Sequence, residues 1–324
     1  MAHTFTRAAL SLLALVLMTG AALAQDPGVA FPADSEASDQ KAGSLLYYNA
    51  YTSDATNPSM SDTLINITNT NSFSGVAVHL FFVNAANCQA ADSFICLTEN
   101  QTARFKTSDL DPGTTGYIVA VASTADGRPA QFNFLIGDEF VKFASGHSAN
   151  LGAVAFSKLN DNVELDADGV TATLRLDGNT YNRAARSVAV DNIPARADGN
   201  DTLLILNRVG GDLSTSAATL GALFGILYDD AETPLSFTVS GGCQLRNSIN
   251  NNFPRTAPRV ETHIPSGRSG WMRIATSSNF AMLGSVINRG TGAAAFSGGH
   301  NLHHLTLTSA TLTIPVFPSN CPDN

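Results

Sequence analysis

The feature that most constrains this chain is an alternation of apolar and polar side chains with a period of two residues. In the segment 170–176, four apolar residues alternate with two threonines and one arginine. Such alternation is typical of an antiparallel sheet that has one face in the core and the other in water. The pattern also occupies 235–240 and 311–316, Val76, Val78, Leu80 and Phe82 share one face of a further strand, and glycine-rich turns separate the runs. The chain is therefore predicted to be all-β, with 216–227 as the only candidate helix.

Five short segments of the first half recur, in the same order, in the second half. They pair 62–65 with 201–204, 93–94 with 236–237, 113–117 with 267–271, 132–135 with 280–283, and 145–147 with 298–300. Each match alone is weak, but their shared order favours an internal duplication. We therefore predict two tandem antiparallel β-sandwich domains of immunoglobulin-like architecture, with Tyr117 superposing on Trp271.

The N-terminal residues have the three parts of an export signal. Residues 1–7 carry a basic end, 8–18 are apolar, and 19–24 end in the small-residue pattern Ala22-Leu23-Ala24. We predict cleavage after Ala24, because the apolar run is shorter than the roughly 20 residues that span a bilayer. The predicted parts of the chain are a signal peptide (1–24), a flexible lead-in (25–42), a first sandwich (43–157), an acidic junction (158–168) and a second sandwich (169–324).

Charge and hydropathy restrict the partners of this chain. The formal net charge is −9, and 14% of the residues are charged. This balance argues against nucleic acid, whose phosphates require a basic surface. No segment after the export signal has the length and apolar character of a membrane-spanning helix. We therefore expect a secreted protein of the cell exterior, the cell surface or the periplasm, whose partner is a copy of itself, another extracellular protein or a glycan.

The four cysteines are an even number in a chain that carries an export signal, which predicts two disulfides. Four cysteines allow three connectivities. The short polar loop between Cys88 and Cys96 favours a local bridge there, which leaves Cys243 to pair with Cys321. A structural zinc site is the rival interpretation, but it requires Cys-x-x-Cys pairs, and the sequence has none.

The junction between the predicted domains is rich in carboxylates that calcium could use. Asp161, Glu164, Asp166 and Asp168 lie within eight residues, and side chains spaced two apart in a loop can converge on one calcium ion. The alternative is a solvated turn, because the spacing lacks the EF-hand pattern. No other cofactor is expected.

The remaining chemistry-bearing residues have ordinary structural explanations as well as functional ones. His300 and His303 are close enough in sequence to share a metal ion, but His147 and His300 occupy matching glycine turns, where hydrogen bonding to the loop would suffice. Trp271 and Tyr117 are predicted to be core anchors. The cluster of Tyr47, Tyr48 and Tyr51 forms either an outward aromatic surface for a glycan or part of a first strand.

No catalytic residues are predicted. The Gly-x-Ser-x-Gly elbow, the His-Glu-x-x-His motif and the phosphate-binding glycine loop do not occur in the sequence. We therefore expect a secreted, non-catalytic structural or adhesive protein, such as a self-assembling cell-surface or filament subunit. One alternative is a soluble extracellular module that binds a glycan or a protein, and another is a hydrolase whose site the sequence does not reveal. The uncharged segment 310–316 either lies inside its own sheet or, at an edge, pairs with a neighbouring subunit.

Overall fold

The computed structural model describes residues 36–162, 165–278, 280–293 and 295–321. The predicted signal peptide, 1–24, lies outside these residues. The described chain is all-β, as the alternation predicts, with two short α-helices, α2 (Thr107–Leu110) and α3 (Val260–His263), and one 3-10 turn, η1 (Arg196–Asp198). The predicted helix over 216–227 is wrong, because those residues form strands β14 (Ser216–Ala217) and β15 (Gly221–Asp229). Apolar side chains at every second position of β15 face the core, which is strand periodicity.

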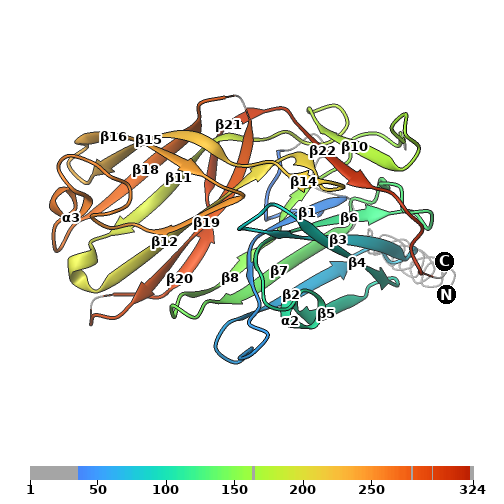
Figure 1. Ribbon diagram of the computed structural model, residues 1–324, viewed down its shortest axis with the longest axis horizontal. Coiled ribbons are helices and arrows are strands. Elements are labelled where there is room, and N and C mark those ends of the chain that lie inside the picture. Colours follow the sequence, from blue (N-terminus) through green and yellow to red (C-terminus); the bar gives the residue numbers. More distant parts are fainter. Residues whose placement is uncertain (1–35, 163–164, 279, 294, 322–324) are drawn as a thin grey trace, which may run out of the picture. The chain divides into compact units, whose positions relative to one another are not determined.

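The strands form five small sheets, which we name I to V (Figure 1). Sheet I has the order β4 (Ala90–Leu97), β3 (Val76–Asn84), β6 (Thr115–Ser123), β1 (Leu45–Thr52) and β9 (Val154–Phe156). Sheet II has the order β5 (Thr102–Lys106), β2 (Asp62–Asn69), β7 (Leu135–Lys142) and β8 (Ser148–Gly152). Sheet III has the order β10 (Thr171–Leu176), β22 (Ala310–Pro315), β13 (Gly211–Asp212) and β14.

The last two sheets come from the second half of the chain. Sheet IV has the order β16 (Pro234–Gly241), β15, β18 (Ser269–Thr276), β11 (Ala184–Pro194) and β21 (His303–Thr308). Sheet V has the order β17 (Gln244–Ser248), β12 (Asn200–Val209), β19 (Ala281–Gly290) and β20 (Gly298–Asn301). The strand pairs in these two sheets are all antiparallel. In sheet III, β13 and β22 run parallel.

The prediction of two tandem immunoglobulin-like sandwiches is wrong. The five small sheets are arranged as the blades of a five-bladed, propeller-like assembly. Separate apolar cores lie among sheets III, I and V, between I and II, between II and V, and between V and IV. Strand β1 shows why the prediction failed, since Leu45 faces one core and Leu46 the next. Alternation identifies the buried face of a strand, but a strand buried on both faces gives no such signal.

Strand order nevertheless repeats along the chain. Sheets I and IV place their strands in the same relative order, and so do sheets II and V, although each sheet draws its strands from scattered parts of the sequence. The correspondence extends to single residues, because Gly116 opposes Tyr51 in sheet I as Gly270 opposes Ile193 in sheet IV. Tyr117 and Trp271, each one residue further on, therefore occupy equivalent positions.

The lead-in predicted over 25–42 is described from residue 36 on, and this part lies against the body of the molecule. Ala37 and Lys41 are buried. Ser38 forms a bridge with Ala155, and the Lys41 Nζ donates a hydrogen bond to Asn182 Oδ1 at 2.6 Å. Residues 36–42 thus extend the fold beside β9.

Candidate functional site

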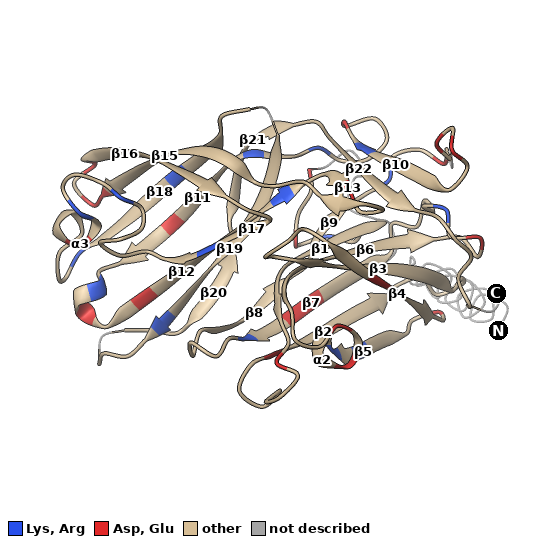
Figure 2. Ribbon diagram, in the orientation of Figure 1, with Lys and Arg blue, Asp and Glu red and all other residues tan. Residues whose placement is uncertain are grey.

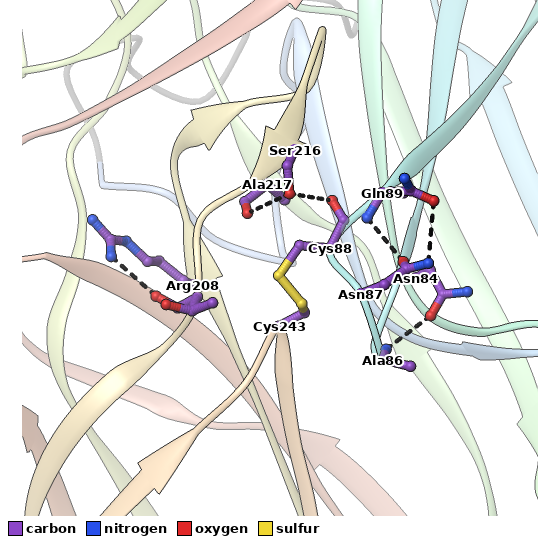
Figure 3. The surroundings of a disulfide bond; sticks show 10 residues. Asn84, Ala86, Asn87, Cys88, Gln89, Arg208, Ser216, Ala217 and Cys243 are labelled. Carbon is purple, nitrogen blue, oxygen red and sulfur yellow. Dashed lines mark hydrogen bonds between the residues drawn. A yellow bond between two sulfur atoms is a disulfide. The ribbon is translucent and has the colours of Figure 1, made fainter.

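All four cysteines form disulfides, as predicted, but the predicted pairing is wrong. The bonds are Cys88–Cys243 and Cys96–Cys321. Cys96 lies near the end of β4, which begins just after Cys88. Because a strand rises about 3.3 Å per residue, these two Cα atoms stand much further apart than the roughly 4.4–6.8 Å that a disulfide allows. Figure 3 shows Cys88 bonded instead to Cys243 of the second half, beside β14, where the Ala217 N–H donates to the Cys88 carbonyl at 2.7 Å.

Two carboxylates of the acidic junction, Asp166 and Asp168, close a turn. Asp166 Oδ2 accepts hydrogen bonds from the hydroxyls of Thr171 and Thr173, both at 2.9 Å. Asp168 Oδ1 accepts from the backbone N–H groups of Val170 and Thr171, both at 3.0 Å. The bond from Val170 leads the interactions that lower the pKa of the Asp168 carboxyl. Asp161 takes part in neither arrangement, and Glu164 lies outside the described residues. Calcium binding here stays a prediction.

Three of the histidines hold structural positions. His79 is buried, bonds to Asp92 at 3.1 Å and stacks on Phe94, and His263 bonds to the Thr233 carbonyl at 3.1 Å. His147 Nε2 lies 2.9 Å from the Asp201 carbonyl. This contact joins the turn between β7 and β8 of sheet II to the start of β12 in sheet V. Burial lowers the pKa of His147 and of His79, which favours their neutral forms. His147 is thus hydrogen-bonded, but its partners are the Ser145 hydroxyl and a carbonyl of the second half instead of the backbone of its own loop.

His300 and His303 differ from these three because both are half exposed and both approach Asp191. Within the described part of the chain, Asp191, His300 and His303 are the one group of three His, Cys, Asp or Glu residues whose ligand atoms all lie within 4.8 Å of one another. The sequence paired the two histidines but missed Asp191, which is more than a hundred residues away. The match of His147 with His300 is also wrong. By register, Glu139 of sheet II corresponds to Val286 of sheet V. Leu151 opposes Glu139 and His300 opposes Val286, so the residue that corresponds to His300 is Leu151.

The aromatic residues divide differently from the prediction. Tyr47, Tyr48 and Tyr51 are buried in β1, and Tyr117 is a core anchor as expected. Trp271 is not, because it is 37% exposed and stacks on Tyr228 with ring centroids 4.5 Å apart.

The outer strands of the sheets differ in charge. The edge strands β4, β5, β10 and β17 each contain a charged residue, and β20 and β21 contain histidines. Strand β16 contains neither, and it is drawn in tan along its length in Figure 2. Strands β8, β9 and β14 are also uncharged, but β8 packs against β20, β9 is bridged by Ser38, and β14 is two residues long. Segment 310–316, the uncharged strand singled out from the sequence, is not an edge, because β22 lies between β10 and β13.

A group of neutral amides in the interior joins two of the sheets. Asn49 Nδ2 donates to the Gly284 carbonyl at 3.1 Å and to Asn301 Oδ1 at 2.8 Å. Asn207 Nδ2 donates to the Asn49 carbonyl at 2.8 Å, and Gln244 Nε2 donates to Asn207 Oδ1 at 2.8 Å. Because buried polar groups that lack partners are costly, this connected set fixes how sheets I and V meet.

No helix of the described residues combines the length and the apolar character needed to cross a membrane.

Comparisons with known proteins give no family for this chain. No protein-family model matches it, and no curated protein matches it. Solved structures that align with it include β-glucuronidase 2 of Bacteroides uniformis, at 9% identity over 85% of this chain and 28% of that one, with a TM-score of 0.17. Vicilin of hazelnut, Corylus avellana, aligns at 9% identity over 76% of this chain and 71% of that one, with a TM-score of 0.19. This chain thus spans less than a third of the glucuronidase, and likenesses this weak support neither a common fold nor a shared activity.

Proposed function

We propose that this chain is a secreted, non-catalytic structural or adhesive protein that assembles with copies of itself through strand β16. The observation that carries the proposal is the character of this strand. It has eight residues, it contains no charge, and no further described strand pairs with its outer side. Proteins that stay monomeric usually protect such an edge with charge, proline, a bulge or a covering element, and of these β16 has only Pro234, at its first residue.

The side chains of β16 suit pairing with a second β16. Phe237 is buried, and the neighbouring apolar side chains of Leu235 and Val239 are partly buried against the same core. The alternate side chains, Ser236 and Thr238, are exposed hydroxyls. Two antiparallel copies related by a twofold axis would keep the apolar faces together and bring hydroxyls opposite one another. The new backbone hydrogen bonds would extend sheet IV across the two subunits.

The two disulfides support a location outside the cytoplasm. Disulfides persist in oxidising compartments and are rare in reducing ones. Both bonds cross between distant parts of the sequence, with separations of 155 and 225 residues. Such crosslinks restrict the unfolded chain strongly, which suits a protein that must survive outside the cell.

A binding module for a glycan is the second candidate, and one observation favours it. Trp271 and Tyr228 form an exposed stacked pair on the outer face of sheet IV. Exposed aromatic rings are common contacts at recognition sites. This candidate requires no assembly, so the same experiment separates the two.

The test is the size of the purified protein as a function of concentration, measured by light scattering after size-exclusion chromatography and by negative-stain microscopy. The parent should form dimers or larger species, and a variant with both Ser236→Lys and Thr238→Lys should be monomeric because like charges meet across the new pair. Ala222→Lys is the matched control, since it adds an exposed lysine to the inner strand β15. A parent that stays monomeric at high concentration overturns the assembly proposal and leaves the binding module ahead.

A further inference from the structure

We infer that Asp191, His300 and His303 form a binding site for a divalent transition-metal ion of the zinc class. This site is independent of strand β16, which lies at the opposite edge of sheet IV from β21.

Local backbone features bring the three residues together. The pairing of β11 with β18 shifts register between Val190 and Ile193, and this bulge leaves the Asp191 side chain exposed instead of facing the core. Bulges commonly redirect a side chain in this way. His300 is the last residue but one of β20 in sheet V, and His303 is the first residue of β21 in sheet IV. Between them the chain crosses from one sheet to the next, so both imidazoles flank the same corner.

Neighbouring contacts hold this corner in place. Leu302, between the two histidines, is buried in the core between sheets IV and V, and its N–H donates to the Gly284 carbonyl at 2.9 Å. The Asn301 Nδ2 donates to the Gly152 carbonyl at 2.6 Å and to Asp39 Oδ2 at 2.8 Å. The backbone that carries both histidines is therefore anchored on each side of the fold, as a preformed metal site requires.

The spacing of the ligand atoms fits a small tetrahedral ion. His300 Nε2 lies 2.7 Å from Asp191 Oδ1, and His303 Nε2 lies 3.5 Å from Asp191 Oδ2. Metal–ligand bonds of about 2.0–2.1 Å in a tetrahedron place ligand atoms about 3.3 Å apart. The two observed separations, which involve different oxygens of the carboxylate, bracket this value, and the three ligand atoms all lie within 4.8 Å of one another, so rotation of the side chains would bring them onto one ion. Three protein ligands leave one position open to water or to another molecule.

The donor set selects the class of ion. Two imidazole nitrogens and one carboxylate oxygen suit zinc, copper or nickel, whereas calcium and magnesium prefer oxygen ligands throughout. The three side chains are 43 to 59% exposed and border a hollow of about 590 Å³ that Glu36 and Asp39 also line. These acidic neighbours favour the approach of a cation, and the exposure provides its entry path.

The first half of the molecule has the same backbone arrangement without the ligands. The bulge in β1 lies between Tyr48 and Tyr51 and places Asn49 where β11 places Asp191. Leu151 and Val154 occupy the positions of His300 and His303. The scaffold therefore does not itself require two histidines and a carboxylate at these positions.

The test is isothermal titration of Zn²⁺ into the full protein, freed of metal and carrying no polyhistidine tag. We expect one saturable site, and we expect His300→Ala, His303→Ala and Asp191→Asn each to weaken it at least about tenfold. His304→Gln is the matched control, because His304 is the next residue of the same strand and lies outside the group. Ca²⁺ and Mg²⁺ should not compete.

A spectroscopic measurement distinguishes this site from loose surface binding. Co²⁺ in place of Zn²⁺ should give the strong visible absorption of a tetrahedral ion, and His303→Ala should abolish it. Circular dichroism of each variant shows whether the fold is retained. The inference is overturned if the parent shows no saturable Zn²⁺ binding, or if all three ligand variants, properly folded, bind Zn²⁺ as the parent does.

Discussion

The bulge in β1 and the bulge in β11 occupy equivalent places in the two halves of the molecule but are used in opposite ways. In β1, Asn49 points into the protein and is 1% exposed, and the Ala50 N–H donates to the buried Glu139 carboxyl at 3.0 Å. In β11, Asp191 points out to the two histidines of the adjoining corner. A bulge frees the same backbone groups in each half, so the surrounding side chains decide whether they are satisfied inside or presented to solvent.

The edge strands show a second contrast between the halves. Strand β4 carries Asp92 and is tied to the end of the chain through Cys96–Cys321, whereas its counterpart β16 has Ser236 and Ser240 at the matching positions. The edge of sheet I is thus protected by charge and by a covalent bond. The edge of sheet IV has neither, which is the contrast on which the proposed assembly depends.

The largest expected effect comes from removing the bond that ties β4. The variant with Cys96→Ser and Cys321→Ser should lose about 5 kcal/mol of unfolding free energy in the chain-entropy account, because the bond closes a very long loop. Urea unfolding measured by circular dichroism gives the value. A loss below about 1 kcal/mol would mean that the disulfide does not constrain this edge.

A reciprocal pair of substitutions tests the two bulges directly. Asn49→Asp should cost about 3 kcal/mol or more, since it removes the two Nδ2 hydrogen bonds and buries a carboxylate beside the Gly284 carbonyl and the Asn301 amide oxygen. Asp191→Asn should change stability by less than about 1 kcal/mol, because its side chain is exposed. Equal costs in urea unfolding would contradict the contrast.

Glu139 should make the unfolding free energy depend on pH. The second half has no equivalent group, because the residue of β19 that corresponds to Glu139 is Val286. Burial raises the pKa of the Glu139 carboxyl well above its ordinary value, although hydrogen bonds from the backbone of Ala50 and Asn49 oppose the shift. The folded state then holds a proton that the unfolded state releases. Its stabilising effect is complete below the unfolded pKa of about 4.3 and is lost as pH rises toward the folded pKa.

The expected size of this effect is a fall of up to about 1.4 kcal/mol in unfolding free energy per pH unit above the unfolded pKa. Glu139→Gln should remove that slope, whereas Asp109→Asn, at an exposed position, should leave it unchanged. Unfolding curves collected across this pH range provide the measurement. An identical slope in the parent and in Glu139→Gln would show that Glu139 is not the responsible group.

The smallest expected change in stability comes from giving β16 the charge that its counterpart has. Ser236 matches Asp92 by register, so Ser236→Asp should alter the unfolding free energy by no more than about 0.5 kcal/mol. It should nevertheless weaken assembly, because like charges would lie close together between the paired strands. Sedimentation of parent and variant at matched concentrations would detect the difference, and unchanged association would argue against pairing through β16.

Sequence patterns predicted the type of structure better than its connections. Alternation predicted strands correctly, although β3 is buried on both faces instead of one, and the match of 62–65 with 201–204 agrees with the register of β2 and β12. Other matches are displaced by one residue. Ser93 opposes Leu80 in sheet I, and the residue at the corresponding position of sheet IV, opposite Gly225, is Phe237 and not Ser236. A one-residue slip is invisible in short similar strands, yet it reverses which face each side chain occupies.

The parts that escaped prediction depend on contacts between distant segments. Sheet stacking, disulfide partners and the meeting of Asp191 with His300 are set by how the five sheets pack, and local periodicity does not report packing. The prediction that Trp271 is buried was also wrong. The apolar strand around it suggested burial, but Trp271 lies on the surface and stacks on Tyr228.

The long reach of the disulfides has a consequence for how the protein matures. A chain made from its N-terminus presents Cys88 and Cys96 together long before Cys243 or Cys321 has emerged, so neither early thiol has its native partner within reach. The two early thiols are eight residues apart in a flexible nascent chain and can bond to each other. Reshuffling of that bond, by exchange with a later thiol, would then be a step toward the native pairing. Maturation should accordingly be faster in the presence of a disulfide isomerase than with an oxidant alone.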